Sequence, residues 1–427
     1  MTEDLSPAER YAAARKRAAE QATALGSFRG MYDFDLDPFQ IEACRALEAG
    51  KGVLVAAPTG SGKTIVGEFA VHLALKQGKK CFYTTPIKAL SNQKYSDLAK
   101  RYGADQVGLL TGDNSVNPDA PVVVMTTEVL RNMLYAGSET LSGLGYTVMD
   151  EVHYLSDRFR GAVWEEVIIH LPASVTLVSL SATVSNAEEF GDWLDTVRGD
   201  TEVIVAEHRP VPLFQHVLAG RRLYDLFEEG EGGKRAVNPD LIRLARTDLS
   251  RPVFGPGRRR GRALREADRE RERRRRSRIW TPSRPEVVER LDAEGLLPAI
   301  TFIFSRAGCE AAVQQCLFAG LRLNDESARA QVREIVERRT ASIPREDLHV
   351  LGYYEWLEGL ERGIAAHHAG MLPTFKEVVE ELFVRGLVKA VFATETLALG
   401  INMPARSVVL EKLVKWNGEQ HADITPG

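Results

Sequence analysis

The sequence lacks the features that mark membrane, secreted and zinc-dependent proteins. No apolar run approaches the roughly 20 residues of a membrane span, and the N-terminal stretch MTEDLSPAERYAAARKR contains acids and no apolar signal region. The few cysteines, Cys44, Cys81, Cys309 and Cys316, are scattered without CxxC spacing, which argues against a zinc module or a disulfide framework. We therefore predict a cytoplasmic protein without a membrane partner, whose cysteines are ordinary buried thiols.

The length and the apolar patterning predict more than one α/β domain. A chain of 427 residues with 44% apolar composition is too long for one core. Short β-rich apolar runs alternate with longer amphipathic segments, which is typical of a parallel sheet flanked by helices. We expect domains at about 28–208 and 286–427. The strand candidates are GVLVAAP, KCFYTTP, APVVVMTT, YTVMDEV and VTLVSLSAT in the first domain, and PAITFIFS, GIAAHH, KAVFAT and SVVL in the second.

The net charge of −4 conceals one strongly basic segment. Residues 258–278 contain twelve Arg and four acids, so this run carries +8 and the remainder of the chain −12. Mixed charge without apolar periodicity predicts a disordered or fraying helical stretch within a linker or insertion at 209–285. The basic run at 257–278 is either a flexible nucleic-acid arm or a solvated tether, and both interpretations stay open. Residues 1–27 are expected to form a helical or disordered extension.

The stretch AAPTGSGKT, residues 56–64, lies between a strand candidate and a helical pattern. In that position a glycine-rich loop turns backbone N–H groups toward phosphates at a helix N-terminus. Lys63 would reach the β- and γ-phosphates of a nucleotide, and the Thr64 hydroxyl would join the Mg²⁺ shell. The loop departs from the GxxxxGK[ST] pattern at Ala57. The predicted nucleotide-binding residues are Pro58, Thr59, Gly60, Ser61, Gly62, Lys63 and Thr64.

Downstream, the stretch YTVMDEVH places two acids at the end of another strand candidate. Mg²⁺ prefers oxygen ligands, so Asp150 is predicted to hold this ion and Glu151 to polarise the attacking water as general base. Zinc would need three or four nitrogen or sulfur ligands, which makes His153 an unlikely metal ligand. The sequence therefore predicts an NTPase in which Lys63, Asp150 and Glu151 are catalytic.

Seven stretches, DEVH among them, occur in the order found in superfamily two helicases. They are TTPIKALSNQKY, TGD, MTTEVLRNML, DEVH, SAT, HHAG and FATETLALGINMPA. From about residue 28 onward the sequence closely resembles the superkiller/Mtr-type DExH-box RNA helicases, and its Ala- and Arg-rich composition suggests the actinobacterial HelY type.

The resemblance implies two tandem RecA-like parallel-sheet domains, ATP and Mg²⁺ as cofactors, and 3′ to 5′ unwinding of RNA in RNA processing or decay. It implies a single RNA strand or a 3′ overhang as the track, and an RNA-decay nuclease as a partner. Two alternatives stay open. One is a DNA-repair-type helicase of similar motif order, and the other is an ATP-gated RNA-binding scaffold that does not unwind.

The resemblance also assigns nucleotide-contacting residues outside the glycine-rich loop. Phe34 and Gln40 match the adenine-recognition segment, where the phenylalanine would stack on the base and the glutamine would hydrogen-bond its edge. A core role stays open for at least one of Phe34 and Phe39. Gly400 and Asn402 match a motif of the second domain that approaches the nucleotide.

Coupling and nucleic-acid residues are assigned in the same way. Ser181 and Thr183 match the coupling motif, and His153 is expected to hydrogen-bond toward that motif or the second domain. Contacts to phosphate and sugar would fix the register of a strand without reading its sequence. The matching positions are Pro86, Lys88, Gln93, Thr127 and Arg131 in the first domain, and Ser305, Arg306, His368, Gly370 and Thr394 in the second.

The resemblance breaks off at the end of the sequence. Related helicases continue beyond the equivalent of ADITPG into a motif whose arginines stabilise the γ-phosphate transition state, and no stretch here matches it. Such an arginine is worth about 10³ to 10⁵ in turnover in other NTPases. We therefore expect an N-terminal part of a larger helicase, with an incomplete second domain and further C-terminal domains as partners. It should bind nucleotide and hydrolyse it weakly on its own.

Overall fold

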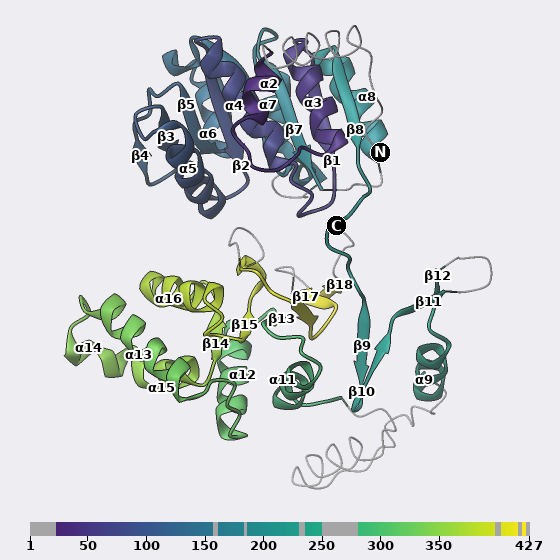
Figure 1. Ribbon diagram of the computed structural model, residues 1–427, viewed down its shortest axis with the longest axis vertical. Coiled ribbons are helices and arrows are strands. Elements are labelled where there is room, and N and C mark those ends of the chain that lie inside the picture. Colours follow the sequence, from purple (N-terminus) through teal and green to yellow (C-terminus); the bar gives the residue numbers. More distant parts are fainter. Residues whose placement is uncertain are drawn as a thin grey trace, which may run out of the picture. The chain divides into compact units, whose positions relative to one another are not determined.

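The computed structural model describes residues 23–156, 161–182, 186–229, 235–249, 281–397, 403–416 and 421–423. The chain divides into two compact units, one built on Met1–Pro212 and the other on Leu213–Pro426. Each unit has its own parallel sheet with helices packed against it (Figure 1). The predicted α/β class with two parallel sheets is confirmed.

The first unit is built on an eight-stranded sheet. Its strands are β1 (Gly52–Ala56), β2 (Lys80–Thr85), β3 (Val107–Leu110), β4 (Ser115–Val116), β5 (Val122–Thr126), β6 (Leu144–Met149), β7 (Thr176–Ser181) and β8 (Thr201–Val205). The spatial order is β4-β3-β5-β2-β6-β7-β1-β8, in which only the β3–β4 pair is antiparallel. The five strand candidates of this half form β1, β2, β5, β6 and β7, so these predictions are confirmed.

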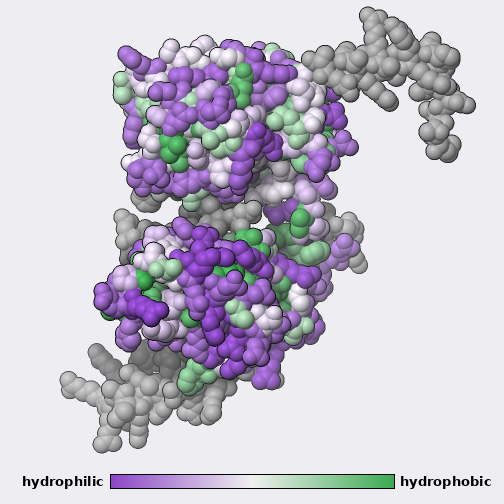
Figure 2. Space-filling view, turned by 60° about the vertical axis from the view of Figure 1, so that its left-hand side comes forward, coloured by the Kyte–Doolittle hydropathy of each residue, from purple (hydrophilic) through white to green (hydrophobic). Residues whose placement is uncertain are grey.

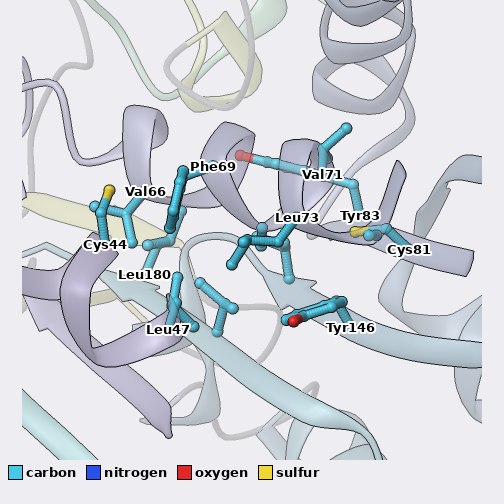
Figure 3. Close-up of a cluster of buried hydrophobic side chains, with 14 of the residues drawn as sticks. Cys44, Leu47, Val66, Phe69, Val71, Leu73, Cys81, Tyr83, Tyr146 and Leu180 are labelled. Carbon is cyan, nitrogen blue, oxygen red and sulfur yellow. The ribbon is translucent and has the colours of Figure 1, made fainter. Parts of the chain in front are cut away.

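Helices cover both faces of this sheet, which explains why its central strands are buried along nearly their whole length. One core lies between the sheet and α2 to α5, and includes Phe69 and Tyr83 (Figure 3). The other lies under α6 to α8 and includes Phe82 and Trp164. The elements are α2 (Ala24–Arg29), α3 (Pro38–Glu48), α4 (Thr64–Lys76), α5 (Lys88–Tyr102), α6 (Thr127–Tyr135), η1 (Glu139–Leu141), η2 (Val152–Ser156), α7 (Gly161–His170) and α8 (Ala187–Arg198).

The second unit has a smaller, wholly parallel sheet of order β14-β15-β13-β16. Its strands are β13 (Ala299–Phe302), β14 (Ile364–His367), β15 (Ala390–Ala393) and β16 (Ser407–Leu410), which are the four predicted for this half. Two cores, one containing Phe375 and one containing Phe392, lie against it. The elements around it are α11 (Arg284–Ala293), α12 (Arg306–Phe318), α13 (Glu326–Thr340), α14 (Arg345–Val350), α15 (Tyr353–Glu361), α16 (Pro373–Val384) and η3 (Glu395–Leu397).

The described part of the segment 209–285 holds short elements. The hairpins are β9 (His216–Ala219) with β10 (Arg222–Asp225) and β11 (Phe227–Glu229) with β12 (Arg235–Val237), followed by α9 (Pro239–Leu249). A further antiparallel pair joins β17 (Val414–Trp416) to β18 (His421–Asp423). The basic run at 257–278 lies outside the described residues.

Helix α2 corrects the expected start of the first domain. Leu25 and Phe28 are buried in the first core, and Glu48 of α3 accepts a hydrogen bond from the backbone N–H of Ala24 at 2.6 Å. Residues 24–27 therefore belong to the first unit, while residues 1–22 of the expected extension lie outside the described part.

Hydrophilic side chains dominate the face of the protein seen in Figure 2. Of the described helices, none is long and apolar enough to cross a membrane. The four cysteines are free and buried, as predicted. Burial raises the pKa of the Cys309 and Cys316 thiols to about 12, so both stay protonated at neutral pH.

Candidate functional site

The glycine-rich loop leaves the carboxyl end of β1 and runs into the N-terminus of α4. Gly60 and Gly62 have φ angles of +84° and +81°, in the left-handed region that favours glycine. A Cβ atom on Gly62 would also lie 2.7 Å from Nε2 of Gln40. Lys63, which follows, is 6% exposed. The loop therefore combines backbone N–H groups at a helix N-terminus with one nearly buried ammonium, which suits a phosphate chain.

The side chain of Gln40 is hydrogen-bonded to the backbone of this loop. Its Oε1 accepts from the N–H of Asp37 at 2.8 Å, and its Nε2 donates to the carbonyl of Gly62 at 2.9 Å. Phe34 is 53% exposed, and its ring centroid lies 5.1 Å from that of Tyr32. A pocket of about 580 Å³ is lined in part by these two aromatic rings. Gln40 thus orders the loop in this structure, and base recognition by Phe34 and Gln40 stays a prediction.

The two acids of DEVH stand at the carboxyl end of β6. Oδ1 of Asp150 accepts from the N–H of Glu151 at 3.0 Å, and Oδ2 accepts from the Tyr83 hydroxyl at 3.0 Å. Oε2 of Glu151 lies 3.7 Å from Nζ of Lys63. The structure therefore brings together the three predicted catalytic residues, although 87 positions separate Lys63 from Asp150 in the sequence.

Burial raises the pKa of both carboxyl groups. For Asp150 the charges of Lys94 and Lys63 and the Tyr83 hydrogen bond oppose this effect. For Glu151 the Lys63 ammonium opposes it, while the Asp150 carboxylate adds to it. A carboxylate with a raised pKa is a better proton acceptor, which is what a general base requires.

The residues at this edge fit a Mg²⁺ ion. Oε2 of Glu151 is buried and accepts no hydrogen bond from the described residues. Asp150 and Thr64 would supply the carboxylate and hydroxyl oxygens that Mg²⁺ prefers.

His153 lies next to the coupling motif. Its Nδ1 accepts from the N–H of Ala182 at 3.4 Å and lies 3.3 Å from Oε2 of Glu151. The predicted hydrogen bond toward SAT is therefore present. Burial, and then the Lys63 charge, lower the pKa of His153, so its ring is neutral and Nδ1 can act as acceptor. Ser181 is buried, and its carbonyl accepts from the N–H of Ala57 at 3.1 Å. Thr183 lies outside the described residues.

The candidate nucleic-acid residues of the first unit divide into exposed and buried ones. Lys88 and Gln93 are exposed on α5, and Nζ of Lys88 lies 2.8 Å from Oδ1 of Asp113. Arg131 is half-buried on α6, 3.7 Å from the Glu166 carboxylate. Thr127 is fully buried and donates to the carbonyl of Thr85 at 3.3 Å, so its side chain braces the sheet instead of projecting from it. Pro86 is buried as well.

In the second unit the candidates gather at the carboxyl ends of β13, β14 and β15. Ser305 caps α12 by accepting from the N–H of Gly308 at 3.2 Å, and Arg306 beside it is exposed. The N–H of Thr394 donates to the carbonyl of His367 at 3.2 Å. A Cβ on Gly370 would lie 3.4 Å from Cδ of Arg306, so the two loops are in contact. Gly400 and Asn402 lie outside the described residues.

The two histidines of HHAG are held by acids of their own unit. His367 lies 2.8 Å from the Glu380 carboxylate, and Nε2 of His368 lies 3.2 Å from that of Glu310. Nδ1 of His368 accepts from the N–H of Gly370 at 3.2 Å. His368 is only 3% exposed, so it shapes the loop instead of presenting its ring to a ligand.

The sequence analysis missed Tyr83 and Lys94, which act on Asp150. Tyr83 lies inside an apolar strand candidate, and Lys94 lies on a helix whose other charged residues are exposed or partly exposed. No spacing rule joins either residue to DEVH, so the sequence gives no signal for them.

Comparison with known proteins agrees with this geometry. Residues 37–190 match the family model of the DEAD/DEAH box helicases. The chain is 64% identical over 408 residues to the probable helicase HelY of Mycobacterium tuberculosis, covering 94% of this chain and 44% of that protein. It is 41% identical over 423 residues to the DExH-box ATP-dependent RNA helicase DExH15 chloroplastic of Arabidopsis thaliana (93% and 35%). It is 38% identical over 402 residues to the ATP-dependent RNA helicase mtr4 of Schizosaccharomyces pombe (93% and 35%).

The chain thus spans less than half the length of these relatives. Residues 37–190 are a DEAD/DEAH box helicase domain, and the chain is similar to HelY and to the superkiller/Mtr-type DExH-box helicases.

Proposed function

We propose that this chain is the ATP-hydrolysing part of a helicase that translocates along RNA. The observation that carries the proposal is the convergence of the glycine-rich loop and DEVH, with Nζ of Lys63 3.7 Å from Oε2 of Glu151. Relatives from Arabidopsis thaliana and Schizosaccharomyces pombe are named as ATP-dependent RNA helicases, which supports RNA as the track.

The chemistry follows from the positions of the side chains. The loop N–H groups and the Lys63 ammonium bind the phosphate chain of ATP. Glu151 accepts a proton from the water whose oxygen attacks the γ-phosphorus. The bond to the β,γ-bridging oxygen breaks, and ADP leaves with that electron pair. A Mg²⁺ ion bound by Asp150 and Thr64 would neutralise charge that develops on the phosphate oxygens.

The track is proposed to run over exposed basic and polar side chains in both units. Lys88 and Gln93 in the first unit and Arg306 in the second are accessible to a phosphate backbone. Contacts of this kind hold a strand without reading its bases. Translocation from 3′ to 5′ and a role in RNA processing or decay beside a nuclease complete the proposal by family resemblance. A cytoplasmic location, expected from the sequence composition, is part of the proposal as well.

The test uses the longest natural polypeptide that contains these 427 residues. Duplexes with matched RNA or DNA 3′ overhangs compete for it at a stated salt concentration, and ATP-driven strand displacement is recorded. We expect the RNA substrate to be bound more tightly and unwound. Preferential unwinding of the DNA substrate would identify a DNA helicase. RNA binding that a non-hydrolysable ATP analogue strengthens, without displacement, would identify a scaffold.

A further inference from the structure

Tyr83 is a buried tyrosine of β2 whose hydroxyl points at the magnesium-binding edge of the first sheet. Its side chain is 0% exposed, and its hydroxyl donates to Oδ2 of Asp150 at 3.0 Å. A buried tyrosine hydroxyl needs a hydrogen-bond partner. Here the partner is one of the two acids of DEVH.

The ring of Tyr83 is fixed by the helix that follows the glycine-rich loop. A Cβ on Gly67 of α4 would lie only 3.0 Å from Cε2 of Tyr83, so this helix backbone lies directly against the ring. Tyr83 belongs to the same core as Val66 and Phe69 of α4, as Figure 3 shows. Helix α5 also packs against this ring, and Nζ of its Lys94 lies 5.4 Å from the centroid of the Tyr83 ring. The hydroxyl is therefore held by packing that includes the helix of the ATP loop.

The Asp150 carboxylate depends on two donors for its orientation. Oδ1 accepts from the Glu151 N–H and Oδ2 from the Tyr83 hydroxyl, both at 3.0 Å. An ionised carboxylate has about four lone-pair sites, so each oxygen keeps one for a further ligand. The χ2 angle of aspartate has a broad distribution of allowed values. Without the Tyr83 hydroxyl, no hydrogen bond among the described contacts would hold Oδ2 in place.

We infer that Tyr83 is a positioning residue that holds the Asp150 carboxylate in the orientation in which it takes Mg²⁺ with ATP. This inference rests on the proposed ATP hydrolysis. Residues that orient a metal ligand typically change metal affinity or activity by about 10- to 100-fold when they are lost. Tyr83 contacts neither the reacting water nor the phosphates in this scheme, and it acts only through Asp150.

The test compares Tyr83→Phe with Tyr146→Phe in the longest natural polypeptide that contains the chain. Tyr146 is a matched control because it is also buried in the first core, and its hydroxyl donates to Gln77 at 3.2 Å, away from DEVH. Binding of a fluorescent ATP analogue and ATP turnover are titrated with Mg²⁺, and thermal unfolding checks each fold.

We expect Tyr83→Phe to raise the Mg²⁺ concentration for half-maximal binding and turnover at least about tenfold, with nucleotide binding in EDTA unchanged. Tyr146→Phe should keep the wild-type Mg²⁺ midpoints. In an Asp150→Asn background, Tyr83→Phe should shift the Mg²⁺ dependence no further.

Wild-type Mg²⁺ midpoints in Tyr83→Phe would overturn the inference, as would equal shifts in the two tyrosine variants. Nucleotide binding by the wild-type protein that does not respond to Mg²⁺ would overturn it as well. Absence of wild-type ATP turnover, with Mg²⁺-dependent binding intact, would instead contradict the proposed function, and the binding titration would still decide the role of Tyr83.

Discussion

Glu151 occupies a strained backbone position at the turn between β6 and η2. Its φ angle is +54°, in the left-handed region, where a Cβ atom costs about 1 to 2 kcal/mol. Strain of this kind is kept where a side chain must point in one direction, and Glu151 points its Oε2 toward Lys63. The strain is a feature of the turn and can be measured separately from activity.

Glycine at this position should relieve the strain. We expect Glu151→Gly to be more stable than Glu151→Ala by about 1 kcal/mol, because only alanine retains the Cβ atom. Chemical denaturation of the two variants measures the difference. Asp97, which is exposed within α5, serves as the control. There the order should reverse, with Asp97→Ala more stable than Asp97→Gly by about 1 kcal/mol. Equal stabilities of the two Glu151 variants would show that the turn carries no strain.

Gly62 combines a left-handed conformation with a close neighbour. Gly62→Ala should cost about 1 to 3 kcal/mol of stability, because its Cβ would meet Nε2 of Gln40 at 2.7 Å. In a Gln40→Ala background the cost should fall by at least about 0.5 kcal/mol. Gly78→Ala is the control, since φ is +65° there and a Cβ would meet nothing within 4 Å. Its cost should not depend on Gln40, and equal coupling at both glycines would contradict the proposed contact.

At this scale the sequence predicts the chemistry of neighbouring residues better than contacts across the fold. Lys63, Asp150 and Glu151 could be predicted because each lies in a short stretch whose residue types match one reaction. The hydrogen bond from Tyr83 to Asp150 joins residues that are 67 positions apart in the sequence and belong to different strands, so no local pattern predicts it. The burial of Thr127 and His368 could not be predicted from the sequence either, because a family resemblance assigns a role to a position but does not say whether its side chain is exposed.

Among the elements, α16 is joined to α13 by an acid that several arginines surround. Oε2 of Glu381 lies 2.6 Å from Nη2 of Arg339, and Oε1 lies 2.6 Å from Nη2 of Arg385. Burial raises the pKa of Glu381, but the hydrogen bond and charge of Arg339 and the charges of Arg385 and Arg338 outweigh it and hold the pKa below its usual value.

Glu381→Gln should therefore destabilise the second unit in a pH-dependent way. The arginines are about half exposed, so we expect a loss of about 1 to 2 kcal/mol near pH 7. A lowered folded-state pKa means that the stabilisation exists above the unfolded pKa, about 4.3, and fades as the pH falls through the folded value. Urea denaturation from pH 7 to pH 3 measures this. Glu377→Gln, exposed on the same helix, should change little, and a Glu381→Gln deficit that is as large at pH 3 as at pH 7 would contradict this explanation.

Burial explains most of the strand predictions in the first sheet, but not β3, which is largely buried and was missed. Strands β1, β2, β5, β6 and β7 are buried on both faces, so they read as continuous apolar runs. Strands β3, β4 and β8 were not predicted. β8 forms one edge of the sheet and is only partly buried, and β4 at the other edge is two exposed residues long. Neither gives a clear apolar signal.

For the whole molecule, the proposal separates nucleotide binding from hydrolysis. Lys63→Ala should weaken ATP binding at least about tenfold, because it removes the nearly buried ammonium that faces the phosphates. Glu151→Gln should leave ATP affinity close to the wild-type value, since it keeps the shape of the side chain. Equilibrium titration with a fluorescent ATP analogue tests both. Equal affinities of the wild type and Lys63→Ala would place the nucleotide elsewhere.

The proposed function can be tested by the rate of ATP hydrolysis, measured with and without single-stranded RNA, in the longest natural polypeptide that contains this chain. If the chain is the ATP-hydrolysing part of an RNA helicase, RNA should stimulate the wild-type rate, and Glu151→Gln should lower the stimulated rate about 10²- to 10⁴-fold. RNA-stimulated turnover that survives unchanged in Glu151→Gln would contradict the proposed function.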